Sequence, residues 1–177
     1  MDKRFTKILY TQTEIEQRIK ELSQWVNETY NNSKDLVIVG LLKGAIPFIA
    51  QLIKGVDIEN ELAFMIASSY HGASQSSGNV KIIMDLEVDI EGKDVLIAED
   101  IIDSGITLDK VKNMLLQRNP KSLKIITLLD KPYNRKVNLE ADKVGFLVPN
   151  EFIVGFGLDY QEKFRGIPFI GVFDPKK

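Results

Sequence analysis

The sequence contains no cysteine and a single histidine, His71, and these shortages exclude several kinds of chemistry. Without cysteine there is no disulfide, no thiolate metal site and no cysteine nucleophile. Zinc sites that need two histidines cannot form, and a serine–histidine–aspartate mechanism would have to use His71. No apolar run approaches the roughly 20 residues that span a bilayer. The first residues, Met1 to Arg4, also lack the apolar segment of a signal peptide, so we expect a cytoplasmic protein.

Neither sign of charge is in large excess, because the net charge is only −2 over 177 residues. Nothing in this balance favours nucleic acid or an anionic membrane as a partner. The hydrophobic content of 44% and charged content of 27% are those of an ordinary globular protein. The length suits one domain with a real core, so we expect residues 1–177 to form a single domain.

Short apolar, β-branched runs alternate with helical patterns through the middle of the chain. A capping box of Thr13 and Glu16 predicts a helix over residues 14–31. Further helices are predicted over 45–54 and from Leu108 to near Asn119, and strands over 36–39, 62–67, 80–86, 95–98, 123–129 and 169–173. This order predicts an α/β fold, with a mostly parallel central sheet flanked by helices. A hairpin around a flexible loop, and a small hood from the two terminal segments, depart from strict alternation.

The stretch Val95–Leu108 concentrates the polar chemistry. A buried-strand pattern ends at Ala98, and the carboxylates Glu99, Asp100 and Asp103 follow it. Ligands of α/β proteins bind at the carboxyl ends of strands, and the free N–H groups at the start of a helix suit a phosphate. Taken singly, these residues equally fit ordinary helix caps and solvated acids. The Leu42-Lys43-Gly44 run likewise fits a tight turn with a surface lysine.

The whole stretch resembles, slot by slot, the phosphoribosyl pyrophosphate signature of type I phosphoribosyltransferases. Four apolar residues precede two acids, two apolar residues, Asp103, Ser104, Gly105, one variable residue and Thr107. Other segments match the 6-oxopurine branch, the hypoxanthine-guanine phosphoribosyltransferases, in order and approximate spacing. These are Leu42-Lys43-Gly44, Ser69-Tyr70, Lys131, and Phe152-Ile153 with Asp159 and Arg165. The resemblance implies the type I phosphoribosyltransferase fold.

The resemblance also implies roles for the residues that would bind the donor. Glu99 and Asp100 would hold the ribose hydroxyls, directly or through Mg²⁺, and Asp159 would bind a second Mg²⁺. The pyrophosphate would lie against Leu42, Lys43, Gly44 and Arg165, with a cis peptide before Lys43. The 5′-phosphate would be cradled by Asp103, Ser104, Gly105, Ile106 and Thr107.

A second set would bind the purine. By the same resemblance, Lys131 would donate to O6, Phe152 would stack on the base, and the Ile153 backbone would bond to its edge. Asp103 would act as general acid or base at N7, and Ser69 and Tyr70 would belong to a loop that closes over the site. We therefore expect a magnesium-dependent purine salvage enzyme that converts hypoxanthine or guanine to IMP or GMP, as a homodimer or homotetramer.

Other motifs are weaker. Gly155-Phe156-Gly157 begins a dinucleotide fingerprint, but its third glycine would fall at Tyr160. Gly92-Lys93 lacks the upstream glycine of a Walker A loop, and a glycosidase would not need the turn and helix that follow the acids. An alternative function is a regulator that binds both phosphoribosyl pyrophosphate and nucleic acid. Such a protein needs a basic surface, which the net charge disfavours. A xanthine-using or pyrimidine-using relative stays open.

Overall fold

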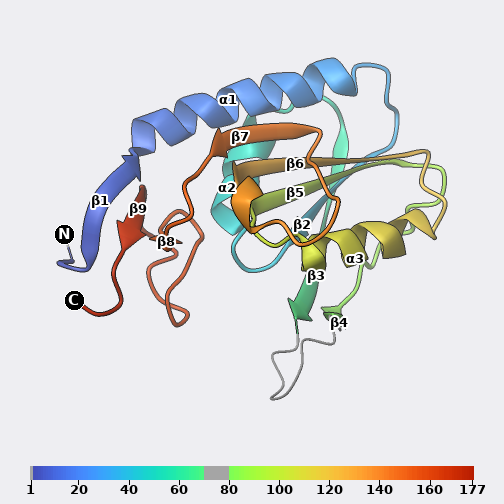
Figure 1. Ribbon diagram of the computed structural model, residues 1–177. Coiled ribbons are helices and arrows are strands. Elements are labelled where there is room, and N and C mark those ends of the chain that lie inside the picture. The colour runs from blue at the N-terminus through green and yellow to red at the C-terminus, as the bar shows by residue number, and fades with distance from the viewer. Residues whose placement is uncertain (1, 70–79) are drawn as a thin grey trace.

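The computed structural model describes residues 2–69 and 80–177 of the chain (Figure 1). Its larger sheet has six strands in the order β4-β3-β2-β5-β6-β7. Neighbouring strands run parallel except β3 and β4, which pair antiparallel as the predicted hairpin. The strands are β2 (Leu36–Leu41), β3 (Asn60–Ser69), β4 (Val80–Met84), β5 (Asp94–Ile102), β6 (Ser122–Asp130) and β7 (Lys143–Leu147). The predicted mostly parallel α/β sheet is confirmed.

Helices cover both faces of this sheet. The helices are α1 (Gln12–Thr29), α2 (Ile46–Leu52) and α3 (Ile106–Leu116), with short 3₁₀ turns η1 (Ile53–Gly55) and η2 (Pro132–Asn134). Ile38 and Leu96 point into one core with α1 and α2, whereas Val37 and Val95 point into a second core with α3. Successive strand residues alternate between the faces, so apolar side chains at every position of β2 are buried.

The amino-terminal helix and its capping box begin two residues earlier in the chain than the sequence pattern predicted. Thr11, not Thr13, is the cap: its N–H donates to Glu14 Oε2 at 2.8 Å, and Glu14 N–H donates to Thr11 Oγ1 at 3.4 Å. Both Thr-x-x-Glu pairs fit a capping box, and β1 (Phe5–Tyr10) ends directly before Thr11. The helix therefore begins where the strand stops.

A second, three-stranded sheet joins the two ends of the chain. It has the order β1-β9-β8, with antiparallel pairs between β1, β9 (Ile170–Phe173) and β8 (Ile153–Val154). Figure 1 shows β1 beside β9, with both termini close together. Phe5 and Phe173 pack edge to face at 5.1 Å in its core. In the described ranges, no helix combines the length and apolarity needed to cross a membrane.

Candidate active site

Strand β5 carries the first two carboxylates within its own length. The strand continues through Ile102, so Glu99 and Asp100 lie within it, near its carboxyl end, instead of following it. The prediction that this strand ends at Ala98 was therefore wrong, because Glu99 pairs with Thr127 and Ile101 with Leu129 of β6, in the same register as the apolar residues before them. Pairing with β2 ends at Ala98, so pairing with β6 holds the backbone beyond that residue.

The turn between β5 and α3 forms a small pocket. Gly105 precedes the helix at φ 79°, a left-handed conformation that glycine adopts without steric cost. Ile106 N–H donates to Ser104 Oγ at 3.4 Å, and Lys136 N–H donates to the Ser104 carbonyl at 2.9 Å. The pocket has a volume of about 140 Å³, and its lining includes Glu99, Asp103, Ser104, Gly105 and Thr107. The structure thus brings these predicted residues together around one hollow.

Burial makes the two β5 carboxylates unusual. It raises the pKa of Glu99 well above its ordinary value, and the neighbouring Asp100 charge raises it further. Burial also raises the pKa of Asp100, to about 6. Removing a carboxylate from water disfavours its charged form, and a nearby cation restores that form. A cation beside either carboxylate would therefore offset the effect of burial on its pKa.

Two glycine-bearing turns close against Asp100. The turn after β2 contains a cis peptide between Leu42 and Lys43, as the family resemblance implied. A Cβ atom built on Gly44 would lie 1.8 Å from Asp100 Oδ2. One built on Gly157 would lie 2.0 Å from the Gly44 carbonyl oxygen. Only glycine allows these close approaches, so segments around residues 44, 100 and 157 meet at one place.

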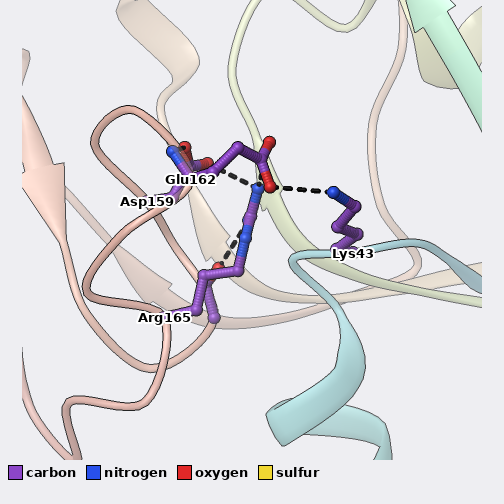
Figure 2. A network of polar contacts seen from close by, with 5 residues as sticks. Lys43, Asp159, Glu162 and Arg165 are labelled. Carbon is purple, nitrogen blue, oxygen red and sulfur yellow. Dashed lines mark hydrogen bonds and ion pairs between the residues drawn. The ribbon is translucent and has the colours of Figure 1, made fainter.

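Polar side chains from two distant segments meet beside this contact (Figure 2). Arg165 Nη2 lies 2.9 Å from Asp159 Oδ1 and 3.2 Å from Glu162 Oε1. Lys43 Nζ lies 2.9 Å from the other oxygen of Glu162. Arg165 Nη1 also donates to the Gly157 carbonyl at 2.8 Å. The structure thus brings the predicted Lys43, Asp159 and Arg165 together, and it adds Glu162, which the sequence analysis missed.

Lys131 and Phe152 also lie in one neighbourhood. Lys131 follows β6 and is only 7% exposed, and its Nζ donates to the carbonyl of Glu151 at 2.7 Å. The next residue, Phe152, has a ring that is 47% exposed and faces Tyr160 edge to face at 6.0 Å. Ile153 is buried and pairs with Val172 in the smaller sheet. Lys131 therefore contacts the backbone directly before the exposed Phe152.

Arg135 is a second residue that the sequence analysis did not single out as functional. It forms an ion pair with Asp130 at the end of β6, and both side chains are largely buried. Its Nη1 donates to the Asp103 carbonyl at 2.5 Å. Arg135 therefore ties the ends of β5 and β6 together and fixes the backbone of the pocket.

Two expectations find less support. Within the described ranges, no cluster of three or more histidine, cysteine or acidic side chains is spaced to hold a metal ion. The predicted ligands instead form the pair Glu99–Asp100, with Asp159 in an ion pair to Arg165. Ser69 ends β3, and Tyr70, which was predicted to belong to a closing loop, lies outside the described residues.

Comparisons with known proteins agree with this geometry. A phosphoribosyl transferase domain matches residues 6–161. The chain is 50% identical to the hypoxanthine-guanine phosphoribosyltransferase of Bacillus subtilis, covering 96% of this chain and 93% of that protein. A crystal structure of a hypoxanthine phosphoribosyltransferase from Staphylococcus aureus superposes with a TM-score of 0.93 at 45% identity, over 98% of this chain and 94% of that one. The chain belongs to the type I phosphoribosyltransferase family, in its hypoxanthine-guanine branch.

A longer relative has the same similarity over part of its length. The chain is 50% identical over 170 residues to the bifunctional protein TilS/HprT of Listeria monocytogenes, and it spans 26% of that protein. The resemblance seen in the sequence, and the type I phosphoribosyltransferase fold that it implied, are confirmed.

Proposed function

We propose that the protein transfers the 5-phosphoribosyl group from phosphoribosyl pyrophosphate to N9 of hypoxanthine or guanine, which yields IMP or GMP and pyrophosphate. This is a purine salvage reaction, with the cytoplasm as its place of action. The observation that carries the proposal is the meeting of Asp100, Gly44 and Gly157 at the carboxyl end of β5. The names of the relatives in Bacillus subtilis and Staphylococcus aureus support the choice of base.

The donor binds across the β5 end in this proposal. The 5′-phosphate occupies the pocket between Asp103 and Thr107, where backbone N–H groups at the start of α3 face a small hollow. Glu99 and Asp100 accept hydrogen bonds from the ribose hydroxyls. The pyrophosphate lies against the turn of Leu42, Lys43 and Gly44, and Arg165 reaches it from the other side.

Magnesium fits the acidic residues of the site. The desolvated Glu99 and Asp100 carry raised pKa values, which a bound cation would offset. Carboxylate oxygens are ligands that Mg²⁺ prefers, so this pair would hold one Mg²⁺ and Asp159 a second. When bound, Mg²⁺ neutralises charge on the pyrophosphate leaving group.

The acceptor base lies between β6 and the smaller sheet. Lys131 donates to the purine O6, and it disfavours adenine because its ammonium would face another donor there. The exposed Phe152 ring stacks on the base, and the backbone at Ile153 bonds to its edge. Asp103 acts at N7 as general acid or base. The smaller sheet of β1, β8 and β9 is the hood of a single domain in this account.

The proposal also includes self-association, as a homodimer or homotetramer. Exposed apolar side chains on the edge strand β4 support it, because Ile83 is 60% exposed there. Sedimentation equilibrium measures the molar mass directly, and a monomer at micromolar concentration would contradict this part.

The experiment that tests the function follows absorbance while phosphoribosyl pyrophosphate and Mg²⁺ are mixed with one base. Hypoxanthine, guanine, xanthine and adenine are run in parallel. We expect turnover with hypoxanthine, guanine or both, and at most traces with adenine. The absence of base-dependent pyrophosphate release with any purine would contradict the proposal.

A further inference from the structure

A carboxylate bridges the two cations that face the proposed pyrophosphate position. Glu162 Oε2 lies 2.9 Å from Lys43 Nζ, and its Oε1 lies 3.2 Å from Arg165 Nη2 (Figure 2). Lys43 and Glu162 are separated by 119 positions in the chain, so the contact closes one turn of the site onto another. The bridge is part of the folded site and not a local pair along one helix.

The turn that carries Glu162 holds it in place. Its N–H donates to Asp159 Oδ2 at 2.8 Å, and Tyr160 and Lys163 exchange backbone hydrogen bonds across the turn. The Glu162 backbone has φ 62°, which presents the carboxylate toward Lys43.

The bridge is nonetheless easy to open. The side chains of Lys43 and Glu162 are 60% and 64% exposed, and exposed ion pairs are weak because water and salt compete with them. Arg165 is more deeply placed, and its Nε is buried without a hydrogen-bond partner in the described part of the chain. An incoming polyanion that binds both Lys43 and Arg165 therefore has this exposed carboxylate to displace.

We propose that Glu162 is an internal competitor of pyrophosphate: its carboxylate occupies Lys43 and Arg165 in the free site and leaves them when the pyrophosphate group binds. This inference rests on the proposed function. Glu162 is then a positioning residue that weakens binding of the pyrophosphate group and eases release of the pyrophosphate product. While the ligand is absent, the Glu162 carboxylate keeps the Lys43 and Arg165 side chains in the site. It returns to them when the ligand leaves.

The substitution Glu162→Gln removes the negative charge and keeps the shape of the side chain. An amide competes poorly for the two cations and does not repel a polyanion. Since an exposed pair has a modest strength, we expect pyrophosphate to bind about 3–10-fold more tightly to the variant. The control is Glu140→Gln, which removes an equal charge from an exposed position outside this cluster.

Isothermal titration calorimetry with magnesium pyrophosphate measures the dissociation constants of the three proteins. We expect tighter binding for Glu162→Gln, an unchanged constant for Glu140→Gln, and a difference that shrinks as ionic strength rises. Product inhibition by pyrophosphate should strengthen by the same factor. Thermal melting confirms that the variants are folded.

The outcomes separate the inference from the proposed function. If the wild-type protein binds pyrophosphate and Glu162→Gln binds it equally or more weakly, the competitor role is wrong, and Glu162 instead supports the cations. If neither protein binds pyrophosphate, the proposed function fails with it. If only the variant binds measurably, the competition is stronger than expected and the inference holds.

Discussion

The carboxylate of Asp100 occupies the space that a side chain on Gly44 would need. A Cβ atom at Gly44 would lie 1.8 Å from Asp100 Oδ2, well inside contact distance. The substitution Gly44→Ala must therefore displace either the carboxylate or the turn that follows β2. Since a displacement of about 1 Å in a reacting geometry can cost about 100-fold, we expect kcat/KM to fall by about that factor. Steady-state kinetics with saturating purine measures the change.

A matched control for this prediction is Gly166→Ala. Apart from its two chain neighbours, no heavy atom of residues 2–69 and 80–177 lies within 4 Å of a Cβ built on Gly166, although Gly166 follows Arg165 directly. We expect this variant to keep wild-type kinetics and melting temperature. Equal activity in the two alanine variants would show that the contact between residues 44 and 100 has no role in turnover.

The position of Lys131 predicts an effect on base selectivity. Its ammonium carries three donors, and one of them reaches the Glu151 carbonyl at 2.7 Å, which leaves others for a ligand. In Lys131→Gln we expect the preference for hypoxanthine over adenine to fall about 10-fold or more, because a hydrogen bond to a charged group contributes about 1.5–3 kcal/mol. The ratio of kcat/KM for the two bases is the quantity to measure.

The control for base selectivity removes a lysine charge elsewhere. Lys110 is exposed on α3, and we expect Lys110→Gln to leave the ratio unchanged. A Lys131→Gln variant that keeps the wild-type ratio would mean that another group recognises the 6-position of the purine.

The buried acid Asp100 predicts a pH-dependent stability. Burial raises its pKa from 3.8 to about 6, so the folded state binds this proton more tightly than the unfolded state does. The stability from this group is therefore fully present below about pH 4 and is lost as the pH rises through about 6. Because asparagine does not ionise, Asp100→Asn should melt above the wild type at pH 7.5, by about 2–6 °C. It should also lose activity.

Melting curves from pH 4 to pH 8 test this prediction. We expect the advantage of Asp100→Asn to shrink toward zero at pH 4, where the wild-type carboxyl is protonated. Glu140→Gln, which changes an exposed acid, should show no such trend. An Asp100→Asn variant that is less stable than the wild type at pH 7.5 would contradict a desolvated charge at this position.

The strands that the sequence predicted best are those buried on both faces. β2 is a continuous apolar run because helices cover each side of it, whereas β5 is apolar only until the acids near its carboxyl end. The edge strand β7 was missed, since it is short and contains Gly145, whose hydrogen lies against the Leu128 carbonyl. β1 was missed because its partner β9 comes from the opposite end of the chain. Such pairing leaves no local pattern.

The residues of the candidate site also differ in how well the sequence could predict them. The acids at the end of β5 and the turn before α3 are consecutive, so a motif could show them. Glu162 and Arg135 are single charged residues, and each has one partner far along the chain: Lys43 lies 119 positions from Glu162, and Asp103 lies 32 positions from Arg135. Many exposed acids and bases precede or follow a turn, and only the fold selects the pairs that meet. Reading one sequence could not distinguish these two from their neighbours.

We propose that the end of β5 performs phosphoribosyl transfer, with Asp103 acting on the base. Parallel measurements on the wild type and Asp103→Asn test it most directly: kcat with hypoxanthine or guanine, and the dissociation constant of phosphoribosyl pyrophosphate. We predict purine-dependent pyrophosphate release by the wild type. In the variant, kcat should fall about 100-fold or more while donor binding stays within about 2-fold, as for loss of a general acid or base. A wild-type kcat in Asp103→Asn would contradict the account.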